Sequence, residues 1–347
     1  MGKNKSSVIL VLVLLVVVLA VAGVYISRGS KEAEETVVSD DRLKVAMVTD
    51  VGGLGDKSFN DAAYDGLKML EADMGVEIKV VESSKMEDYV PNLKSLADQK
   101  YDMIWAIGFL MTDALAEVAE MYPEQKFGII DAVVEKDNVH SVCFKEEEGS
   151  FLVGAIAGVD SNSGKVGFVG GMEFPLIQKF EAGYLAGVKA ARPDAKIYTA
   201  YAGAFDDPAK GKELAASQFN VGADIVYHAA GGTGLGVISA AKEKGTGYWA
   251  IGVDKCQHAE GQVDGKDYVL ACMVKRVDMG VYKASKEALE GNFTSGLTLM
   301  GLAEEGVGVC EAAKETASAE ALAKVEEYTK KIVSGELQVP ENPKDVQ

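Results

Sequence analysis

The sequence predicts an α/β fold of two doubly wound lobes, each built on a parallel sheet, with a ligand cleft between them. From Leu43 onward, short apolar runs rich in β-branched residues alternate with segments whose apolar residues recur every three or four positions. This alternation of strand and helix patterns is typical of parallel α/β sheets. It pauses at Asn162-Ser163-Gly164 and restarts at Lys165, which indicates a second lobe.

The first lobe is predicted to begin with a buried strand at Leu43–Thr49. Ser58 is expected to cap the helix that follows, because serine is a favoured N-cap residue. The apolar face of this helix is formed by Ala63, Leu67, Leu70 and Met74. Further strands are expected at 78–81, 103–107, 127–130 and 139–143, and a helix rich in glycine and alanine at 146–159.

The second lobe shows the same pattern. Asp207-Pro208 is expected to start a helix, with the acid as N-cap and proline in the first turn. Strands are expected at 165–169, 196–200, 224–228, 248–253 and 268–274, a helix from after Lys275 to about Leu289, and a final amphipathic helix at 317–333. We therefore predict an N-terminal lobe at 43–160, completed by a crossover near 276–300, a C-terminal lobe at 161–275, and a C-terminal segment at 301–347.

Residues 1–27 are predicted to be an N-terminal membrane anchor or signal segment. Lys3 and Lys5 precede 19 apolar residues at 8–26. This run approaches the roughly 20 residues that cross a bilayer as a helix, which favours an uncleaved anchor. Ala20-Val21-Ala22 leaves a cleaved signal open as the alternative. The basic end should stay in the cytoplasm, so the binding domain is expected on the extracytoplasmic side, joined to the cell membrane by an acidic tether at 28–42.

The charge of the chain argues against nucleic acid as a partner. There are 35 Lys+Arg against 53 Asp+Glu, which gives a formal net charge of −18 at pH 7. Binding to phosphate backbones needs clustered basic side chains, and no basic run occurs here.

Four cysteines, Cys143, Cys256, Cys272 and Cys310, lie in the part predicted to be exported. One or two disulfides and small buried thiols are both consistent with their number in a domain of this size. Their spacings match no zinc pattern. His258 stands two residues after Cys256, but no further ligand or orienting group is near in sequence, so we predict no metal and no Cys/His catalytic site.

The residues after each predicted strand are expected to face a cleft between the lobes, because open parallel sheets bind ligands beyond the carboxyl ends of their strands. In the first lobe, these residues belong to a glycine-rich loop and to the end of the strand at 127–130. In the second lobe, they follow the strands at 196–200, 224–228, 248–253 and 268–274. The candidate ligand-binding residues are Asp50, Phe59, Asn60, Asp131, Phe205, Gly232, Asp254 and Lys275.

This set of side chains suits a nucleoside. Phe59 and Phe205 can stack on a flat ring whose edge Asn60 and an acid can read. Carboxylates such as Asp254 can accept two sugar hydroxyl hydrogen bonds, and Lys275 can donate to a ligand oxygen. A nucleotide fits less well, because phosphate prefers a helix N-terminus with a basic partner. Ordinary alternatives stay open: core phenylalanines, aspartate helix caps and a solvated lysine.

No motif for nucleotide hydrolysis or acyl transfer is present. Residues 231–236 read GGTGLG, but Val237 stands where G-x-G-x-x-G needs its last glycine, so the segment is interpreted as a tight turn. Neither G-x-x-x-x-G-K-[ST] nor G-x-S-x-G occurs. We therefore predict no cofactor and no enzymatic activity.

Eight segments in order, over about Leu43–Val309, resemble the basic membrane protein family, which includes purine nucleoside receptor lipoproteins. They include KVAMVTDVGGLGDKSFNDAAYDGL (44–67), KFGIIDAVV (126–134), FDDPAKGKELA (205–215), AAGGTGLGV (229–237), AIGVD (250–254) and MVKRVD (273–278). The resemblance implies a type I periplasmic-binding-protein fold. It also implies that the protein delivers a purine nucleoside to the permease of an ABC transporter.

Within that family pattern, Phe59 and Phe205 would be the stacking pair. Asn60 and Asp131 would read the base, and the ribose contacts would be Asp50, Gly232, Asp254 and Lys275. A sensory surface receptor with the same cleft is the main alternative function, and a nucleoside-cleaving enzyme is a further one.

The chain departs from the family in two places. Bacterial members usually carry a lipidated N-terminal cysteine, whereas this chain has an apolar segment, which suggests an archaeal or otherwise lipid-independent surface protein. After Asp254 the sequence reads Lys255-Cys256-Gln257, where the family more often has a second aspartate before glutamine.

Overall fold

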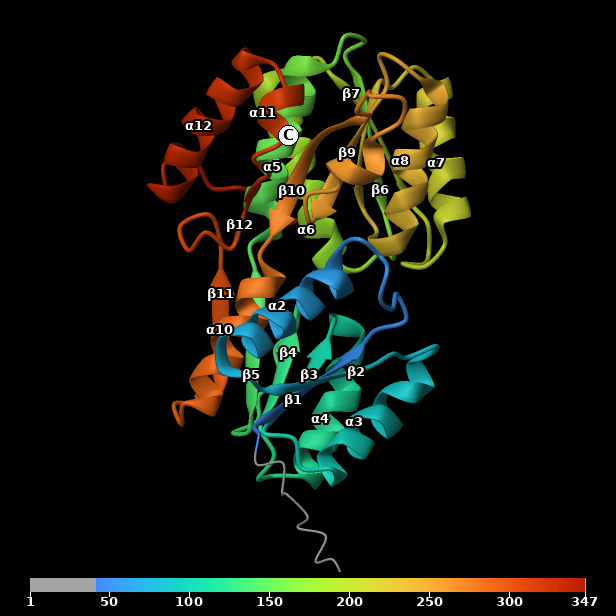
Figure 1. Ribbon diagram of the computed structural model, residues 1–347. Coiled ribbons are helices and arrows are strands. Elements are labelled where there is room, and N and C mark those ends of the chain that lie inside the picture. Colours follow the sequence, from blue (N-terminus) through green and yellow to red (C-terminus); the bar gives the residue numbers. More distant parts are fainter. Residues whose placement is uncertain (1–41, 347) are drawn as a thin grey trace, which may run out of the picture. The chain divides into compact units, whose positions relative to one another are not determined.

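The computed structural model describes residues 42–346. The predicted membrane segment at 1–27 and nearly all of the predicted tether at 28–42 lie outside these residues. Arg42–Gln347 is one compact unit, and it contains two lobes, each with a six-stranded sheet (Figure 1). Among residues 42–346, no helix combines the length and apolar character that crossing a bilayer requires.

The first lobe holds a fully parallel sheet in the order β2-β1-β3-β4-β5-β11. Helix α2 packs against α10, and α3 packs against α4, so the helices lie on the sheet as two pairs. The strands are β1 (Lys44–Thr49), β2 (Glu77–Val81), β3 (Met103–Ile107), β4 (Phe127–Ile130), β5 (Val139–Phe144) and β11 (Gly296–Met300). The helices are α2 (Phe59–Met74), α3 (Tyr89–Asp98), α4 (Thr112–Met121) and α10 (Val277–Leu289), with short 3₁₀ turns η1 (Met86–Asp88) and η2 (Phe109–Met111).

The second lobe repeats this topology in the order β7-β6-β8-β9-β10-β12, and only β12 runs antiparallel to its neighbour. Its strands are β6 (Lys165–Gly170), β7 (Lys196–Tyr201), β8 (Ile225–Ala229), β9 (Trp249–Asp254), β10 (Val269–Lys275) and β12 (Val307–Val309). Its helices and turns are α5 (Glu146–Asp160), α6 (Pro175–Ala191), α7 (Pro208–Asn220), η3 (Gly231–Thr233), α8 (Gly234–Lys244), α9 (His258–Gly261), α11 (Ala313–Thr316), α12 (Ala319–Val333) and η4 (Pro343–Asp345).

The predicted fold class is confirmed, and burial explains why the strands could be recognised. The central strands β3 and β8 are buried along their whole length, because helices cover both faces of a parallel sheet. Strand β3 consists only of apolar residues, and β8 does so apart from His228. Strands β2 and β7, at the sheet edges, are partly exposed and carry lysines. Strands β11 and β12 were not predicted from the sequence.

Two predicted helix caps have different outcomes. The Asp207 side chain accepts a hydrogen bond from the Lys210 backbone N–H at 2.9 Å, with Pro208 in the first turn, as predicted. Ser58 occupies the predicted N-cap position of α2, but its hydroxyl makes no capping hydrogen bond and instead donates to Asp254 Oδ2 in the other lobe at 2.5 Å. Asp56 caps α2 instead, accepting the backbone N–H groups of Ser58, Asn60 and Asp61 at 2.8–3.1 Å.

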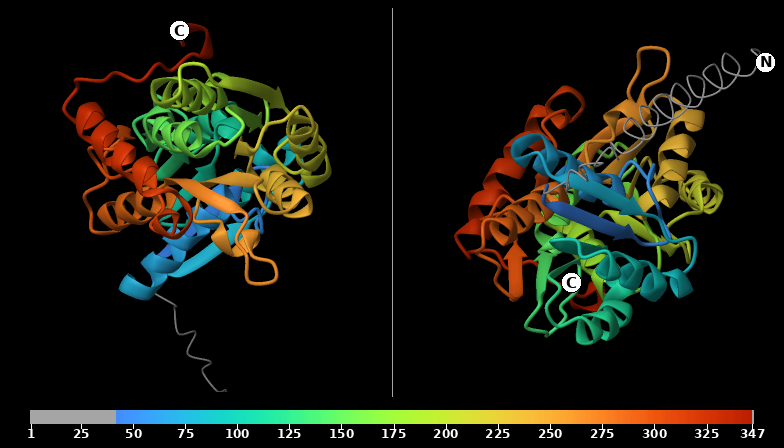
Figure 2. Two further views of the ribbon diagram at one scale, coloured as in Figure 1. Left: turned by 90° about the horizontal axis from the view of Figure 1, so that it is seen from above. Right: turned by 60° about the horizontal axis from the view of Figure 1, so that its bottom comes forward.

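The boundary between the lobes differs from the predicted one at residue 160. Helix α5 packs mainly against α6 and also touches β10, β12 and α12, so it belongs with the second lobe. Figure 2 shows α12 alongside α5 on this lobe. The chain returns to the first lobe for α10 and β11, and the segment after residue 306 joins the second lobe through β12 and α12.

Three stretches of chain therefore connect the lobes: β5 to α5, β10 to α10, and β11 to β12. Each leaves a strand at or next to one edge of its sheet. Hydrogen bonds join them, because Lys145 N–H donates to the Met300 carbonyl at 3.1 Å and Arg276 N–H donates to the Gly306 carbonyl at 2.8 Å. The three connections are thus joined to one another by backbone hydrogen bonds.

Glycines allow α5 and α6 to pack with their backbones nearly in contact. A Cβ atom on Gly154 would overlap the Tyr184 carbonyl oxygen, and one on Gly187 would overlap the Phe151 carbonyl oxygen. These carbonyls are held in helices, so they cannot rotate away as a side chain could. The contact fixes α6, whose first turns carry Leu176, Ile177 and Phe180 to the pocket described below.

We expect Gly187→Ala to lower the free energy of unfolding by about 1–3 kcal/mol, because the added methyl forces two helices apart. This loss should appear although alanine is the better helix former. Urea unfolding followed by circular dichroism measures it. Gly308→Ala is the control, since a Cβ there meets no atom within 4 Å. Equal stability of the two variants would contradict the packing argument.

Candidate functional site

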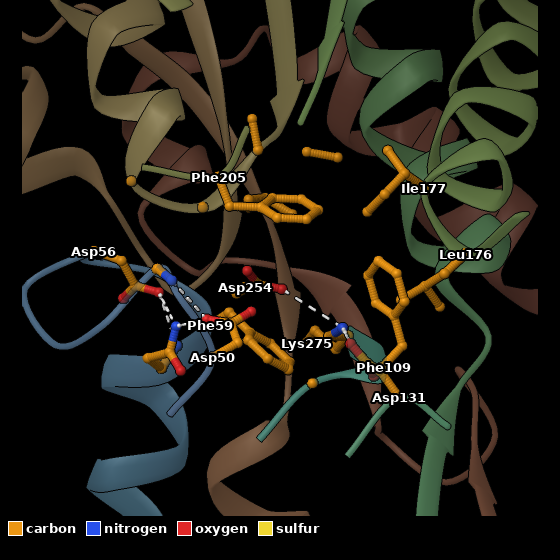
Figure 3. A pocket seen from close by; sticks show the side chains of 18 of the residues that line it. Asp50, Asp56, Phe59, Phe109, Asp131, Leu176, Ile177, Phe205, Asp254 and Lys275 are labelled. Carbon is orange, nitrogen blue, oxygen red and sulfur yellow. Dashed lines mark hydrogen bonds and ion pairs between the residues drawn. The ribbon is translucent and has the colours of Figure 1, made fainter. Parts of the chain in front are cut away.

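A pocket of about 520 Å³ lies between the lobes, at the carboxyl ends of strands from both sheets (Figure 3). All of the residues that the sequence singled out line it: Asp50, Phe59, Asn60, Asp131, Phe205, Gly232, Asp254 and Lys275. The structure thus brings the set together, while the role of each side chain toward a ligand stays a prediction.

The pocket also contains residues that sequence reasoning missed. Phe109 lies just after β3, so the rule that selected the other strand ends would have found it. Asp56 belongs to the glycine-rich loop already noted. Leu176, Ile177 and Phe180 come from the first turns of α6, and their helical spacing resembles that of core residues.

On the first-lobe side, hydrogen bonds fix the orientation of Asn60. Its Nδ2 donates to Asp50 Oδ1 at 2.8 Å and to Asp56 Oδ2 at 3.3 Å. Asp50 Oδ1 also accepts the Gly52 N–H at 2.9 Å, in a turn that Gly53 completes with φ +61°. Both carboxylates accept hydrogen bonds, so the amide nitrogen of Asn60, not its oxygen, must face them. The amide oxygen, Oδ1, is buried and has no hydrogen-bond partner among residues 42–346.

Lys275 is a buried cation at the end of β10, with 2% of its surface exposed. Its Nζ lies 2.5 Å from Asp131 Oδ2, 3.7 Å from Glu146 Oε1 and 3.9 Å from Asp254 Oδ1. It also lies over the rings of Phe59, Phe144 and Phe180, 4.9–5.4 Å from their centroids. Burial alone would lower its pKa, but the three carboxylates together raise it, so Lys275 stays charged.

Asp131 and Asp254 occupy corresponding places, each following or ending the fourth strand of its lobe. Both have left-handed backbone conformations, with φ 67° and φ 62°. Such conformations are uncommon for residues other than glycine and cluster at functional sites. Asp131 Oδ1 is buried and has no hydrogen-bond partner within residues 42–346. The strained turns thus place two carboxylates at the pocket, and Oδ1 of Asp131 is available to accept a hydrogen bond.

Burial keeps the carboxyl groups of the site unusually easy to protonate. It raises the pKa of Asp50 and of Asp254 to about 6 and that of Glu146 to about 8. Within residues 42–346, the pocket lining contains four carboxyl groups, those of Asp50, Asp56, Asp131 and Asp254, and one lysine, Lys275, which Glu146 also faces from outside the lining. The pocket therefore favours neutral ligands that donate hydrogen bonds and disfavours anions.

Aromatic rings from both lobes border the pocket. In Figure 3, Phe205 lies above the open space, Phe59 lies below it, and Phe109 stands beside it. The Phe205 ring rests against Gly171, where a Cβ would overlap it, and its centroid lies 6.2 Å from that of Phe109 in an edge-to-face arrangement. A planar ligand can therefore enter between aromatic faces contributed by different lobes.

Polar contacts join the lobes around the pocket. Besides the Ser58–Asp254 hydrogen bond, Lys255 pairs with Asp65 at 2.5 Å. Gln257 Nε2 donates to the Lys57 carbonyl at 3.1 Å. The loop after β9 thus contacts the N-terminal end of α2, and the two walls of the pocket are held together.

Residues 43–343 match the model of the Bmp family, described as "ABC transporter substrate-binding protein PnrA-like". The chain belongs to this family. The resemblance noted in the sequence is confirmed, and with it the coarse function: the chain is a substrate-binding protein of an ABC transporter.

Several Bmp-like proteins are similar over nearly the whole chain. It is 40% identical over 343 residues to the CD4+ T-cell-stimulating antigen of Listeria innocua, covering 93% of this chain and 96% of the relative. It is 35% identical over 350 residues to the ABC transporter nucleoside-binding protein BmpA of Lactococcus lactis, covering 94% and 98%. A solved ABC transporter solute-binding protein from Aeropyrum pernix K1 has 32% identity and a TM-score of 0.79, covering 86% and 94%.

In this Bmp protein, we expect Lys275→Met to lower the free energy of unfolding at pH 7.5 by about 3–5 kcal/mol, because three buried carboxylates lose their cation. This loss of stability should be smaller at pH 5. Without the lysine, the pKa values of the three carboxyl groups in the folded state rise further, so the variant loses more stability relative to wild type as the pH increases. Urea unfolding at both pH values measures this. Lys283→Met, at an exposed position on α10, should leave stability nearly unchanged. A pH-independent deficit would argue against the electrostatic explanation.

Proposed function

We propose that this chain captures a purine nucleoside between its two lobes, outside the cell membrane, and delivers it to the permease subunits of an ABC transporter. One observation carries the proposal: a pocket bordered by aromatic rings from both lobes also contains buried acceptor oxygens without partners and an excess of carboxylates. The transport role rests on the family, and the name of the Lactococcus relative supports the ligand class.

The aromatic rings support a base as one half of the ligand. Phe59 and Phe205 come from different lobes, so a ring held between them links the lobes, and closure is favoured when ligand is present. Stacking contributes about 1–3 kcal/mol per base. We infer a purine because a two-ring base covers more of both phenylalanine faces than a single-ring base does.

The carboxylates support a sugar as the other half. We assign the base edge to Asn60 and Asp131 and the ribose to Asp50, Gly232, Asp254 and Lys275. Asn60 is hydrogen-bonded to Asp50, and Asp131 to Lys275, so each proposed base contact is oriented by a proposed ribose contact. Ribose hydroxyls supply donors to carboxylates such as those of Asp50 and Asp254, which accept without needing a proton of their own.

The charges of the pocket support a nucleoside over a nucleotide. The one lysine already faces three carboxylates, so a phosphate would meet uncompensated negative charge. The lining within residues 42–346 includes no serine, cysteine or histidine, and we propose binding and release without a chemical step.

Calorimetry of the full chain in mild detergent, refolded to remove carried ligand, tests the proposal. Adenosine, guanosine or inosine should bind, while ribose and guanosine monophosphate should give no heat and cytidine should bind more weakly. Phe205→Ala should weaken purine nucleoside binding by about 5- to 150-fold, the range that 1–3 kcal/mol of stacking implies. Phe174→Ala is the matched control, because Phe174 contacts Phe109 but does not line the pocket. No heat with any purine nucleoside would refute the proposed ligand.

Binding should also depend on pH. Asp50 and Asp254 have pKa values of about 6 in the free protein, and hydroxyl donors stabilise their ionised forms, so binding should release protons. We expect affinity to fall between pH 6 and pH 5 by up to about tenfold for each carboxyl that must ionise. The folded protein without ligand should not lose stability as the pH falls from 6 to 5. Carboxyl pKa values that are raised in the folded state reduce its stability as the pH rises from about 4 to 6. Calorimetry from pH 5 to 7.5 would show an unchanged affinity if these carboxylates made no ligand contact.

A further inference from the structure

Four soft ligand atoms gather in the second lobe, beside the pocket but outside its lining. They belong to Cys256 and His258 after β9, Cys272 in β10, and Cys310 after β12. The three Sγ atoms and one imidazole nitrogen all lie within 4.8 Å of one another. These residues are spread over more than fifty positions of the sequence, and the fold brings them together.

Backbone contacts hold the cysteines in this arrangement. Strand β12 pairs antiparallel with β10, and the Cys310 N–H donates to the Cys272 carbonyl at 3.0 Å. The Gln257 N–H donates to Cys272 Sγ at 3.1 Å. This bond holds Cys256 and His258, the chain neighbours of Gln257, close to that sulfur. Cys272 and Cys310 are buried, whereas Cys256 is exposed. The cluster is thus formed at a sheet edge with one member open to solvent.

His258 is oriented as histidine ligands of metals usually are. Its Nδ1 lies 2.7 Å from Asp267 Oδ2. Asp267 is itself fixed, because its carboxylate accepts the Val269 N–H and a Gln262 Nε2–H, both at 2.9 Å. The other ring nitrogen, Nε2, is buried and has no hydrogen-bond partner among residues 42–346. A carboxylate that holds one imidazole nitrogen while the other binds a metal is a recurring arrangement at such sites.

We propose that Cys256, His258, Cys272 and Cys310 bind one thiophilic divalent cation, represented here by Zn²⁺. Three sulfurs and one imidazole match a closed, tetrahedral structural zinc site. Oxygen-seeking cations such as Mg²⁺ and Ca²⁺ are excluded because the cluster offers no oxygen ligand. Zn–S bonds of about 2.3 Å give S···S distances of about 3.8 Å, so the ligand atoms must approach by about 1 Å or less.

Binding is a simple exchange of protons for the metal. Three protons leave the cluster in all, so that each sulfur binds the metal as a thiolate and His258 binds through the lone pair of Nε2. With all four positions taken by protein atoms, the cation holds structure and performs no chemistry.

The metal would fix the loop after β9, whose side chains contact the first lobe. Residues 255–258 carry both the Lys255–Asp65 pair and the Gln257 hydrogen bond to the first lobe, and they directly follow Asp254 of the pocket. A cation would tie this loop to β10 and to the segment after β12. It would therefore stabilise the second-lobe wall against which the first lobe closes.

Metal analysis of the full chain, purified under reducing conditions without chelator and loaded with Zn²⁺, tests the site by inductively coupled plasma mass spectrometry. We expect one Zn²⁺ per chain. The Co²⁺ form should show the intense visible absorption of a tetrahedral site and a thiolate-to-metal charge-transfer band. Zn²⁺ loading should also raise the Tm of the chain.

Variants separate this site from chance binding. Cys256→Ser, at an exposed position, should abolish stoichiometric binding, while Asp267→Asn should weaken Zn²⁺ affinity by about 10- to 100-fold through His258. Cys143→Ser is the control, because Cys143 lies in β5 of the first lobe. Circular dichroism of Cys256→Ser confirms that the variant is folded.

Three results would overturn the proposal: a wild-type chain that takes up no Zn²⁺ when reduced, equal Zn²⁺ content in Cys256→Ser and Cys143→Ser, or a Co²⁺ spectrum without the charge-transfer band. Mass spectrometry of the alkylated chain decides between metal and disulfide: a cystine among these cysteines that persists under the loading conditions overturns the site. Metal content is measured without nucleoside, so the outcome is independent of the proposed ligand.

Discussion

A single buried cation organises the region where the two lobes meet. Lys275 has carboxylate neighbours from both lobes, and an ion taken out of water must be matched by such partners. Lys275 directly precedes the connection from β10 to α10, and Glu146 begins α5 just after the connection from β5. The same group of charges therefore lies at two of the three connections and at the pocket. The pocket and the connections between the lobes therefore share charged residues.

The sequence predicted the fold and the position of the pocket between the lobes well, for a physical reason. Strands buried on both faces are largely apolar, so β1, β3, β4 and β8 are recognisable without any knowledge of their neighbours, although His228 interrupts β8. Once the strands are placed, topology alone brings their carboxyl ends to one cleft. Asp50, Asp131 and Asp254 could be selected because each lies at a strand end, and no information on conservation was needed.

Features that depend on partners far away in the chain could not be predicted. The pattern of Ser58 is that of a helix cap, but a carboxylate from the other lobe takes its hydroxyl. Helix α5 shows almost no polar face, so nothing in its sequence indicates which lobe it covers. The cluster of Cys256, Cys272 and Cys310 depends on the short strand β12, whose three residues carry no strand signal of their own.

The three connections between the lobes limit the relative motions that remain. A single flexible linker would leave one rigid body free to rotate about several axes relative to the other. Here three chain segments at one sheet edge are joined to each other by hydrogen bonds, Lys145 to Met300 and Arg276 to Gly306. Twisting or sliding would shear those bonds, whereas rotation about an axis through them would not. Rotation about that axis is therefore the relative motion of the lobes that these connections oppose least, and a single angle describes it.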